Sequence, residues 1–531
     1  MAKKKKEEKL LKWSELIIWC YLAVMLGLYP LYYRNNYADI GTAKYLFFRL
    51  VTVVMLLYLI VTQLSSCLFD AQKRKIKHCF TLMDRLVLLY GGAAGISWCL
   101  SPFRTEGFIG SDGWYMGFLS QILFIGIYFA VSRFGTEEPW PLWVAGISSF
   151  FVFLLAYLNR FDVDPLGMYE GFAQKKGYLG VIGQATLYSS YVTVILPAGM
   201  GLYMILDWEK QKRGPLIRGL LSVLLLIGFG SGITQSSDSF YLGMGAAFVF
   251  LLWFAMEDLK FWKRYVEIGI LAVASAKFTG ILQFMFPERV PPLDPLSFVV
   301  TKSHLGWFVL AAAVLCYIGT CLAENWYNRK KTPALPRMIR RFRAVFFTLL
   351  ILAILSLPVL VWLVTTGRAA GNFGALQESG YMVFDHSWGN GRGTIWMHAA
   401  RVFRDYSPLR KLVGCGPDVL IYYTLEHYAA LFQEPWGALL GARNAHNEWL
   451  TAFVDYGILG GTVYLAIFLA ALTRCVRFCK KEPVLLAFGA AVIAYMGHNI
   501  SCYQQAICTP LIFIIMGTAE YLIRKQKFAE S

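Results

Sequence analysis

The residues best suited to chemistry stand close together near the C-terminal end of the chain. Arg443, Asn444, His446, Asn447 and Glu448 directly precede a strongly apolar run. An imidazole with its ordinary pKa of about 6.5 can accept a proton from a hydroxyl group near neutral pH. A titratable group beside a membrane is costly to keep there unless it has a task. The spacing therefore predicts a general base at the mouth of a membrane helix.

His446 is the residue that we expect to be this base. A helix N-terminus disfavours the imidazolium form, which keeps the ring neutral. Asn447 and Glu448 are close enough in sequence to orient the ring. His498, in the segment GlyHisAsnIleSerCys, and Asp385 are the alternative bases if His446 is only structural.

Arginine is the natural electrostatic partner of such a base, because its planar guanidinium binds phosphate oxygens in pairs and stays charged. Arg392 and Arg443 lie in the polar segment before His446. Other chemistries fit less well. The chain has no GxSxG turn for a serine nucleophile, and its 7 histidines are scattered without metal-ligand spacing. The pattern favours transfer from a diphosphate-linked donor without a metal or cofactor.

The elements that must position these residues are membrane helices. The chain has 531 residues, of which 57% are hydrophobic, and apolar runs long enough to cross a bilayer recur throughout. We expect an all-α polytopic membrane protein with about fourteen transmembrane helices, twelve being the lower bound. The runs lie near 14–33, 44–64, 82–101, 114–133, 140–158, 181–206, 217–234, 239–256, 265–286, 299–323, 344–366, 446–474, 484–503 and 507–524. The first run follows a lysine-rich start without a cleavage site, which predicts a retained signal anchor.

The net charge of +17 at first suggests a nucleic-acid partner, but its distribution argues against one. Basic clusters occur in alternate loops, which the positive-inside rule places in the cytoplasm together with both termini. We therefore expect contacts with anionic membrane lipids and no nucleic acid. The clusters are the N-terminus, Lys73–Lys77, Lys210–Arg218, Lys260–Arg264, Arg329–Arg343, Arg474–Lys481 and Arg524–Lys527.

This topology divides the chain into three parts: helices one to eleven in 1–366, a large extracytoplasmic loop in 367–445, and three helices with a cytoplasmic tail in 446–531. Within the loop, 393–406 has the pattern of an amphipathic helix, which could lie in the head-group plane. Smaller outer loops with mixed polar residues fall at 104–117, 159–184, 234–240 and 497–502. The sequence thus places function on the outer face. Lys277 stands apart inside the ninth run, either in a functional cavity or satisfied by neighbouring carbonyls.

Two sequence segments carry a resemblance to a known family. HisAsnGluTrpLeu at 446–450, followed by TyrGlyIleLeuGlyGly at 456–461, is similar to a His-Asn pair before a glycine-rich helix. GlyArgGlyThrIleTrp at 391–396, running on to 408–418, is similar to the outer segment that precedes that histidine. In these features the chain resembles the O-antigen ligase and polymerase superfamily of bacterial envelope glycosyltransferases.

The resemblance implies glycan transfer from an undecaprenyl-diphosphate carrier to an acceptor hydroxyl, at the outer face of the bacterial cytoplasmic membrane. His446 would be the general base, and Arg392 and Arg443 would bind the donor diphosphate. The acceptor would be a glycan, a lipid or a wall polymer. Fixed cations near the head groups suit a lipid diphosphate leaving group, whose charge grows during transfer.

The chain departs from the family pattern at two places. Gly183-Gln184 stands where the family often has Gly-Asn, and Asp238-Ser239 stands where it often has Ser-Arg. Asp238 and His498 are therefore expected only as supporting residues. Lys277, Lys302 or Arg289 would have to replace the missing arginine, and Lys277 is our candidate for donor binding.

Other functions stay open at this point. A flippase or transporter of lipid-linked oligosaccharides suits the number of helices and Lys277, although the two halves show no internal repeat. A peptidoglycan glycosyltransferase of the shape-and-division type would use an outer aspartate such as Asp385. A membrane sensor or purely structural protein would need no reactive histidine. The sequence does not distinguish a ligase from a polymerase.

Overall fold

The computed structural model describes residues 2–69, 80–170, 178–208, 212–235, 237–330, 334–368 and 380–530. The first half contains α1 (Ala2–Ala23), η1 (Val24–Leu28), η2 (Tyr29–Leu31), α2 (Ile40–Phe69), α3 (Leu82–Leu100), α4 (Arg104–Ile109), α5 (Phe118–Phe134), α6 (Trp140–Arg160), β1 (Tyr178–Leu179), β2 (Gly183–Gln184), α7 (Ala185–Ile205), α8 (Gly214–Ile233) and α9 (Asp238–Ala255). The second half contains α10 (Leu259–Met285), α11 (Pro295–Lys302), α12 (Leu305–Lys330), α13 (Ala334–Thr365), α15 (Trp388–Asp405), α16 (Pro408–Val413), α17 (Leu420–His427), η5 (Ala429–Gln433), η6 (Gly437–Gly441), α18 (Glu448–Phe478), α19 (Val484–His498) and α20 (Thr509–Glu530).

The molecule is a helical membrane protein, as the sequence predicts. Each of the fourteen apolar runs lies mostly on helix, the first of them on α1, η1 and η2. The run at 181–206 also contains β2, and the run at 299–323 is divided between α11 and α12. Among the described residues, 10 helices are long and apolar enough to cross a membrane, and α5 and α19 are shorter apolar helices. The only described strands, β1 and β2, pair antiparallel over two residues each.

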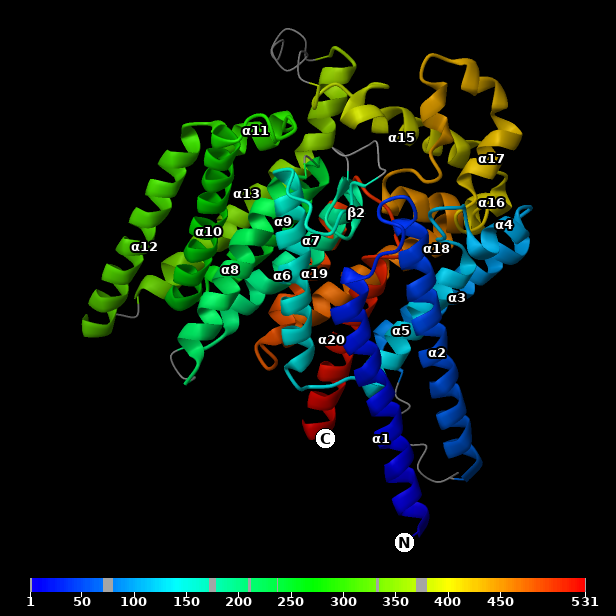
Figure 1. Ribbon diagram of the computed structural model, residues 1–531, viewed down its shortest axis with the longest axis horizontal. Coiled ribbons are helices and arrows are strands. Elements are labelled where there is room, and N and C mark those ends of the chain that lie inside the picture. Colours follow the sequence, from blue (N-terminus) through cyan, green and yellow to red (C-terminus); the bar gives the residue numbers. More distant parts are fainter. Residues whose placement is uncertain are drawn as a thin grey trace.

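The termini lie at one end of the molecule and the helices of the large insert at the other (Figure 1). α4, α11, α15, α16 and α17 all gather at the end away from the marked N- and C-termini. This arrangement is the one that a large loop across the membrane from both termini requires. Which end faces the cytoplasm stays a prediction from the charge pattern, and the Lys73–Lys77 cluster of that pattern lies outside the described residues.

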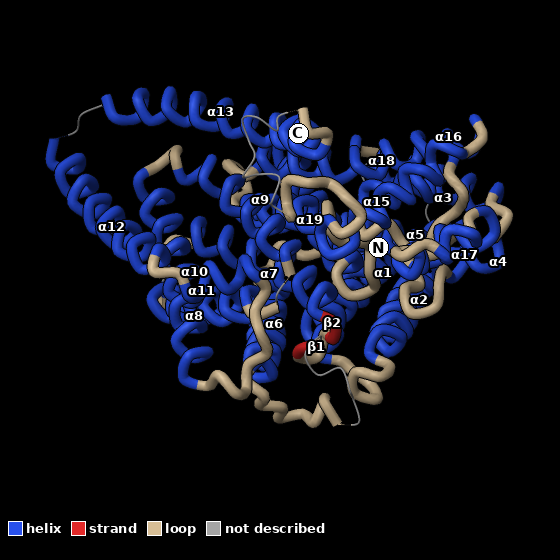
Figure 2. Tube along the Cα trace, turned by 90° about the horizontal axis from the view of Figure 1, so that it is seen from above, coloured by secondary structure: helices blue, strands red, loops and turns tan. Residues whose placement is uncertain are grey.

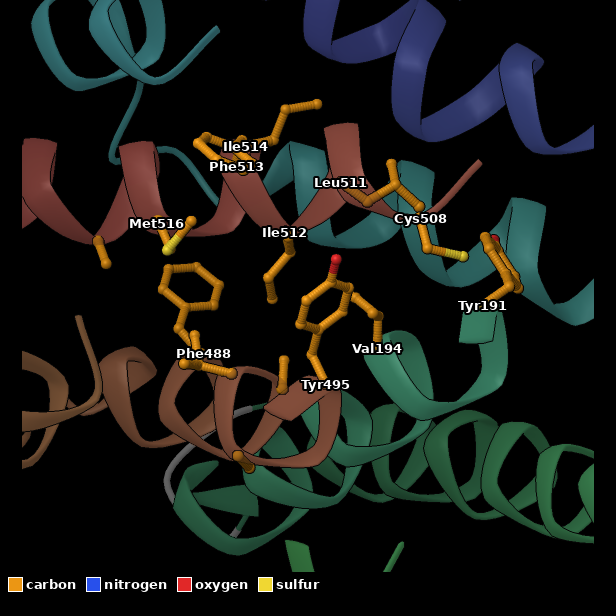
Figure 3. Packing of buried hydrophobic residues seen from close by; sticks show 14 of the residues in the cluster. Tyr191, Val194, Phe488, Tyr495, Cys508, Leu511, Ile512, Phe513, Ile514 and Met516 are labelled. Carbon is orange, nitrogen blue, oxygen red and sulfur yellow. The ribbon is translucent and has the colours of Figure 1, made fainter. Parts of the chain in front are cut away.

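The core forms where α7, α19 and α20 meet. Figure 3 shows Tyr495 of α19 between Val194 of α7 and Ile512 of α20. α7 and α19 approach closely because Gly201 has no side chain: a Cβ there would lie 2.4 Å from the Cα of Ala487. Small residues permit such contacts between membrane helices. The helix that ends at His498 is thereby fixed rigidly against its neighbours.

α12 and α13 pack very differently from this core. Only 6% of the most apolar window of each helix is buried within the protein. In Figure 2, α13 runs along the upper edge of the molecule, and α12 lies at its left end. Their exposed apolar side chains suit contact with lipid tails, because helices in a bilayer need no polar face. The rigid part of the molecule is thus the bundle around α7, α18 and α19.

Candidate functional site

His446 lies in a tight turn directly before α18. Its backbone is left-handed, with a φ of 47°, and its N–H donates to Asn444 Oδ1 at 2.9 Å. Asn447 caps the helix, because its Oδ1 accepts the N–H of Leu450 at 3.0 Å. A left-handed non-glycine residue is uncommon and persists where its surroundings fix it, often at functional sites. His446 thus lies at the N-terminus of a helix, as predicted from the sequence.

The imidazole of His446 lies beside two aromatic rings that contact each other, with centroids 4.4 Å apart. Tyr503 meets it edge-on with ring centroids 4.9 Å apart, and Trp114 does so at 6.5 Å. Within the described part of the chain, neither ring nitrogen takes part in a hydrogen bond with protein. Burial, and then the positive charge of Arg392, lower the pKa of His446 to about 4. The ring is therefore neutral at pH 7, and a nitrogen is left for a substrate.

Arg392 begins the regular part of α15, after a sharp bend. Gly389, Asn390 and Gly391 have positive φ values, and Arg392 Nη1 donates back to the Gly389 carbonyl at 2.9 Å. Its Nε is buried and, among the described residues, has no partner. Its charge acts on His446, and it is also close enough to interact electrostatically with His498 and Asp238. The fold thus brings together one predicted arginine and three predicted polar residues from distant segments.

Arg443 lies beside the glycine-rich loop at 107–117. A Cβ added to Gly113, whose φ is 84°, would be 3.5 Å from Arg443 Nη1. The charge of Arg443 also acts on Asp418, although burial is the larger effect and raises the pKa of Asp418 to about 7. The second predicted arginine is therefore part of the same outer surface, on the side of Trp114.

Asp418 fastens that loop in place, a role that the sequence analysis did not assign to it. Its carboxylate accepts the N–H of Ser111 at 2.7 Å and of Met116 at 3.0 Å. Its own N–H donates to Asp455 Oδ2 in α18 at 3.0 Å. The first two of these bonds join segments about 300 residues apart, so no local sequence signal could have shown them.

A break in α18 completes the frame. Gly457 is left-handed, with a φ of 66°, and a Cβ there would lie 2.3 Å from the Leu412 backbone of α16. The carbonyl of Asp455, freed by the break, accepts the N–H of Gly416 at 3.1 Å and the hydroxyl of Ser97 at 2.5 Å. Only glycine combines that conformation with that approach. The first turns of α18 are thus set apart from the rest of the helix.

Three of the four smaller outer loops predicted from the sequence meet beside His446, and the third in sequence order contacts α7. Trp114 brings in the first, Gln184 reaches Tyr503 from the second at 3.5 Å, and Tyr503 follows the fourth. The third joins through Ser239, which is 3.2 Å from Ser189 in α7. A cavity adjoins the two aromatic rings that contact His446, and it is lined by Trp114, Met116, Asp418, Asn444, Glu448, Thr451, Ala452, Asp455, Tyr456, Tyr464, Tyr503 and Gln504.

The predicted supporting residues are close by, but none bonds the His446 ring. Glu448 is buried and accepts hydrogen bonds from Tyr464 and Tyr495. His498 is buried with both ring nitrogens engaged, Nε2 at 2.9 Å from Ser189 Oγ and Nδ1 at 2.8 Å from Asn499 Oδ1. A histidine so occupied is poorly placed to serve as the alternative base. Asp238, at the start of α9, stands near Arg392.

Lys277, the third predicted donor-binding residue, has a different setting. Its Nζ donates to the carbonyls of Thr301 at 3.0 Å and Ser303 at 2.6 Å, at the C-terminal end of α11. It contacts the end of α11 and the ring of Trp307 in α12. The structure therefore does not bring Lys277 into contact with His446, Arg392 or Arg443. Its surroundings fit the second interpretation given above, a lysine whose charge is satisfied by neighbouring carbonyls.

The amphipathic segment at 393–406 is a helix, but its apolar face does not lie free for lipid. Ala399 and Val402 are fully buried in a small core with Val419 and Val454. His398 closes that core, with Nε2 at 2.9 Å from Thr424 Oγ1, and burial lowers its pKa to about 4. The described part of the large insert from α15 onwards therefore packs as a cap on α18. Within the described residues, no group of three or more His, Cys, Asp or Glu side chains could hold a metal ion.

These features define a class: a polytopic membrane protein whose outer loops converge on a neutral histidine and an arginine. Residues 293–465 match a family model described as O-antigen ligase. The match confirms the resemblance to the O-antigen ligase and polymerase superfamily, and it covers the segment that contains Arg392, Arg443 and His446. A search of curated proteins found no match to the chain. At the family level, the activity is that of a membrane glycosyltransferase or ligase.

Proposed function

We propose that the protein transfers a glycan from an undecaprenyl-diphosphate carrier to an acceptor hydroxyl at the outer face of the bacterial cytoplasmic membrane. The observation that carries the proposal is the position of His446, a buried and neutral imidazole on which the charge of Arg392 acts, beside Trp114 and Tyr503 of two outer loops. A cation that the protein holds next to a neutral imidazole suits a reaction in which a hydroxyl loses a proton while a diphosphate gains charge.

The proposed step uses these residues in separate roles. The acceptor oxygen forms a bond to the anomeric carbon of the donor sugar as the bond from that carbon to the diphosphate oxygen breaks. His446 takes the acceptor proton, and the electron pair of the broken bond stays on the leaving diphosphate. Arg392 and Arg443 balance that charge, so we propose that no metal ion takes part. Gly113, which has no side chain, leaves room over Arg443.

The setting of the site supports a membrane-adjacent substrate. His446 stands at the start of α18, which is long and apolar enough to cross a membrane. Holding two reactants at one surface lowers the entropy that their meeting must lose. Lys277, the residue that favours transport in the sequence, bonds two backbone carbonyls instead of facing an open space. The structure therefore adds nothing in favour of a flippase.

The test is to delete the gene, identify the lipid-linked glycan that accumulates, and use that material as the donor for the purified protein. We expect single repeat units to accumulate if the protein is a polymerase, and long chains if it is a ligase. Normal envelope glycans and no accumulating donor would contradict the proposal. Transfer by the wild type but not by His446→Ala would connect the activity to this site.

A further inference from the structure

The end of α19 is hydrogen-bonded to the start of α18 through one pair of residues. The N–H of Glu448 donates to the carbonyl of Asn499 at 3.0 Å, and Asn499 Nδ2 donates to Glu448 Oε2 at 2.6 Å. The same carboxylate accepts the hydroxyls of Tyr464 at 2.5 Å and Tyr495 at 2.9 Å. A buried carboxylate needs this many donors, and they fix its position.

His498 extends this contact toward α7 and α9. Because the amide nitrogen of Asn499 points to Glu448, its oxygen faces His498 Nδ1, which must be the donor. His498 Nε2 is then an acceptor for the hydroxyl of Ser189 at 2.9 Å. Ser189 is 3.2 Å from Ser239, in the first turn of α9 next to Asp238. One oriented chain of hydrogen bonds therefore runs from α9 to the start of α18.

Every member of this chain is buried, although Glu448 also lines the cavity beside Trp114 and Tyr503. Ser189, His498 and Asn499 are at most 1% exposed, and Glu448 is 2% exposed. The chain ends two residues from His446, yet none of its bonds reaches the imidazole. Its effect on the ring must therefore pass through the backbone of the turn.

The turn needs such support from both sides. On its N-terminal side, Asn444 Oδ1 accepts the N–H of His446, and Thr451 Oγ1 accepts the N–H of Ala445 at 3.1 Å. On its C-terminal side, Glu448 is the anchor. The left-handed backbone of His446 is disfavoured for a residue with a side chain, so it would relax if one anchor were released.

We propose that Ser189, His498, Asn499 and Glu448 are positioning residues that hold the His446 turn in its reactive place. The inference rests on the proposed role of His446 as the base. Weakening the chain moves the imidazole relative to the acceptor hydroxyl but leaves Arg392 and Arg443 in place. The turnover number falls, whereas the KM for the donor stays nearly the same.

Glu448→Gln is the sharpest variant, because the two side chains have nearly the same shape. The purified variant is assayed with the lipid-linked glycan that accumulates in the deletion strain. We expect kcat to fall about ten- to a hundredfold, as a misplaced catalytic group does, with donor KM changed less than about twofold. Tyr464→Phe, which removes one donor to Glu448, is expected to lower kcat less. Tyr188→Phe is the matched control, since it removes a buried hydrogen bond to Ser231 that does not lead to the turn.

The decisive measurement combines Glu448→Gln with His446→Ala. A positioning residue acts only through the base, so the double variant should be no slower than His446→Ala alone. A further loss by the same factor as in the wild-type background would show a general structural role and overturn the inference, as would a wild-type kcat in both Glu448→Gln and Tyr464→Phe. If His446→Ala itself keeps the wild-type rate, it is the proposed function that fails.

Discussion

Lys277 and His446 look alike in the sequence, and the structure separates them. Both are ionisable residues in or beside an apolar run, and both were candidates for the site. Lys277 has its charge spread over two backbone carbonyls where α11 ends, so its hydrogen-bonding capacity is used by the fold. His446 has a fixed backbone, and among the described residues its ring nitrogens have no hydrogen-bond partner in the protein. The two residues differ in where they form hydrogen bonds. Lys277 does so through its charged side chain, and His446 does so through its backbone N–H.

The largest expected effect is on transfer by His446→Ala. A general base typically contributes about 10²- to 10⁴-fold, and we expect kcat to fall by that factor while the protein still folds and inserts. His446→Gln should be nearly as slow, because an amide does not accept the proton. Near-normal transfer by the Gln variant would make His446 as structural as Lys277.

Arg392 and Arg443 test the cationic half of the site. We expect Arg392→Ala and Arg443→Ala to raise donor KM and lower kcat/KM by more than about tenfold, since the bond of a charged group to its partner contributes more than a neutral one. Lysine at either position should restore only part of the loss, because a point charge does not replace the paired guanidinium bonds. Lysine variants with the donor KM and kcat/KM of the wild type would show that these arginines only contact lipid head groups.

The pH profile sharpens the same comparison. Protonation of His446 removes the base, and its pKa is lowered to about 4. The rate should therefore fall only as the pH drops through about 4, and His446 should add no inflection between about pH 5 and 8. The measurement is log kcat against pH for wild type and for Arg392→Ala. Removing that positive charge should move the acid limb upward in pH, and an acid limb already near 6.5 in the wild type would contradict the assignment.

Lys277→Met should change stability more than activity. It removes the lysine donor from the carbonyls of Thr301 and Ser303, and among the described residues only the Ser303 carbonyl keeps another bond, from the N–H of Gly306 at 3.2 Å. A buried carbonyl without a partner costs about 1 to 3 kcal/mol. Thermal unfolding in detergent should show a lower midpoint, and donor KM should stay within about twofold of wild type. A large rise in donor KM would return Lys277 to the donor site, as first predicted from the sequence.

Chelation should have the smallest effect, because the proposed mechanism needs only the imidazole and the two arginines. Transfer by the purified protein should be the same with and without EDTA. Loss of activity that Mg²⁺ or Mn²⁺ restores would contradict the proposal more directly than any of the substitutions.

Hydropathy alone predicted most of the fold, because a run long enough to cross a bilayer has few alternatives to a helix. The approach of Arg392 to His446 was expected from a family resemblance, not from spacing. The bond from Asp418 to the loop at Ser111 and the chain from His498 to Glu448 were not predicted. Both depend on pairs that are distant in sequence, and hydrophobic periodicity contains no information about them. The setting of Lys277 could not be predicted because its carbonyl partners, Thr301 and Ser303, lie within the predicted span 299–323. A continuous helix there would have used those carbonyls, whereas the structure has a short break after α11 that leaves them for the lysine.

The break at Gly457 affects how the protein adapts to membranes of different thickness. As one straight rod, the 31 residues of α18 would be about 46 Å long at 1.5 Å per residue, whereas a hydrocarbon core is roughly 30 Å thick. The surplus lies in the turns before the glycine, which α3, α16 and the insert hold. A helix that tilts to match a thinner or thicker bilayer can therefore pivot below the break. The position of the His446 imidazole relative to the membrane surface then stays the same. We therefore expect similar rates of transfer by the protein in vesicles of short- and long-chain lipids.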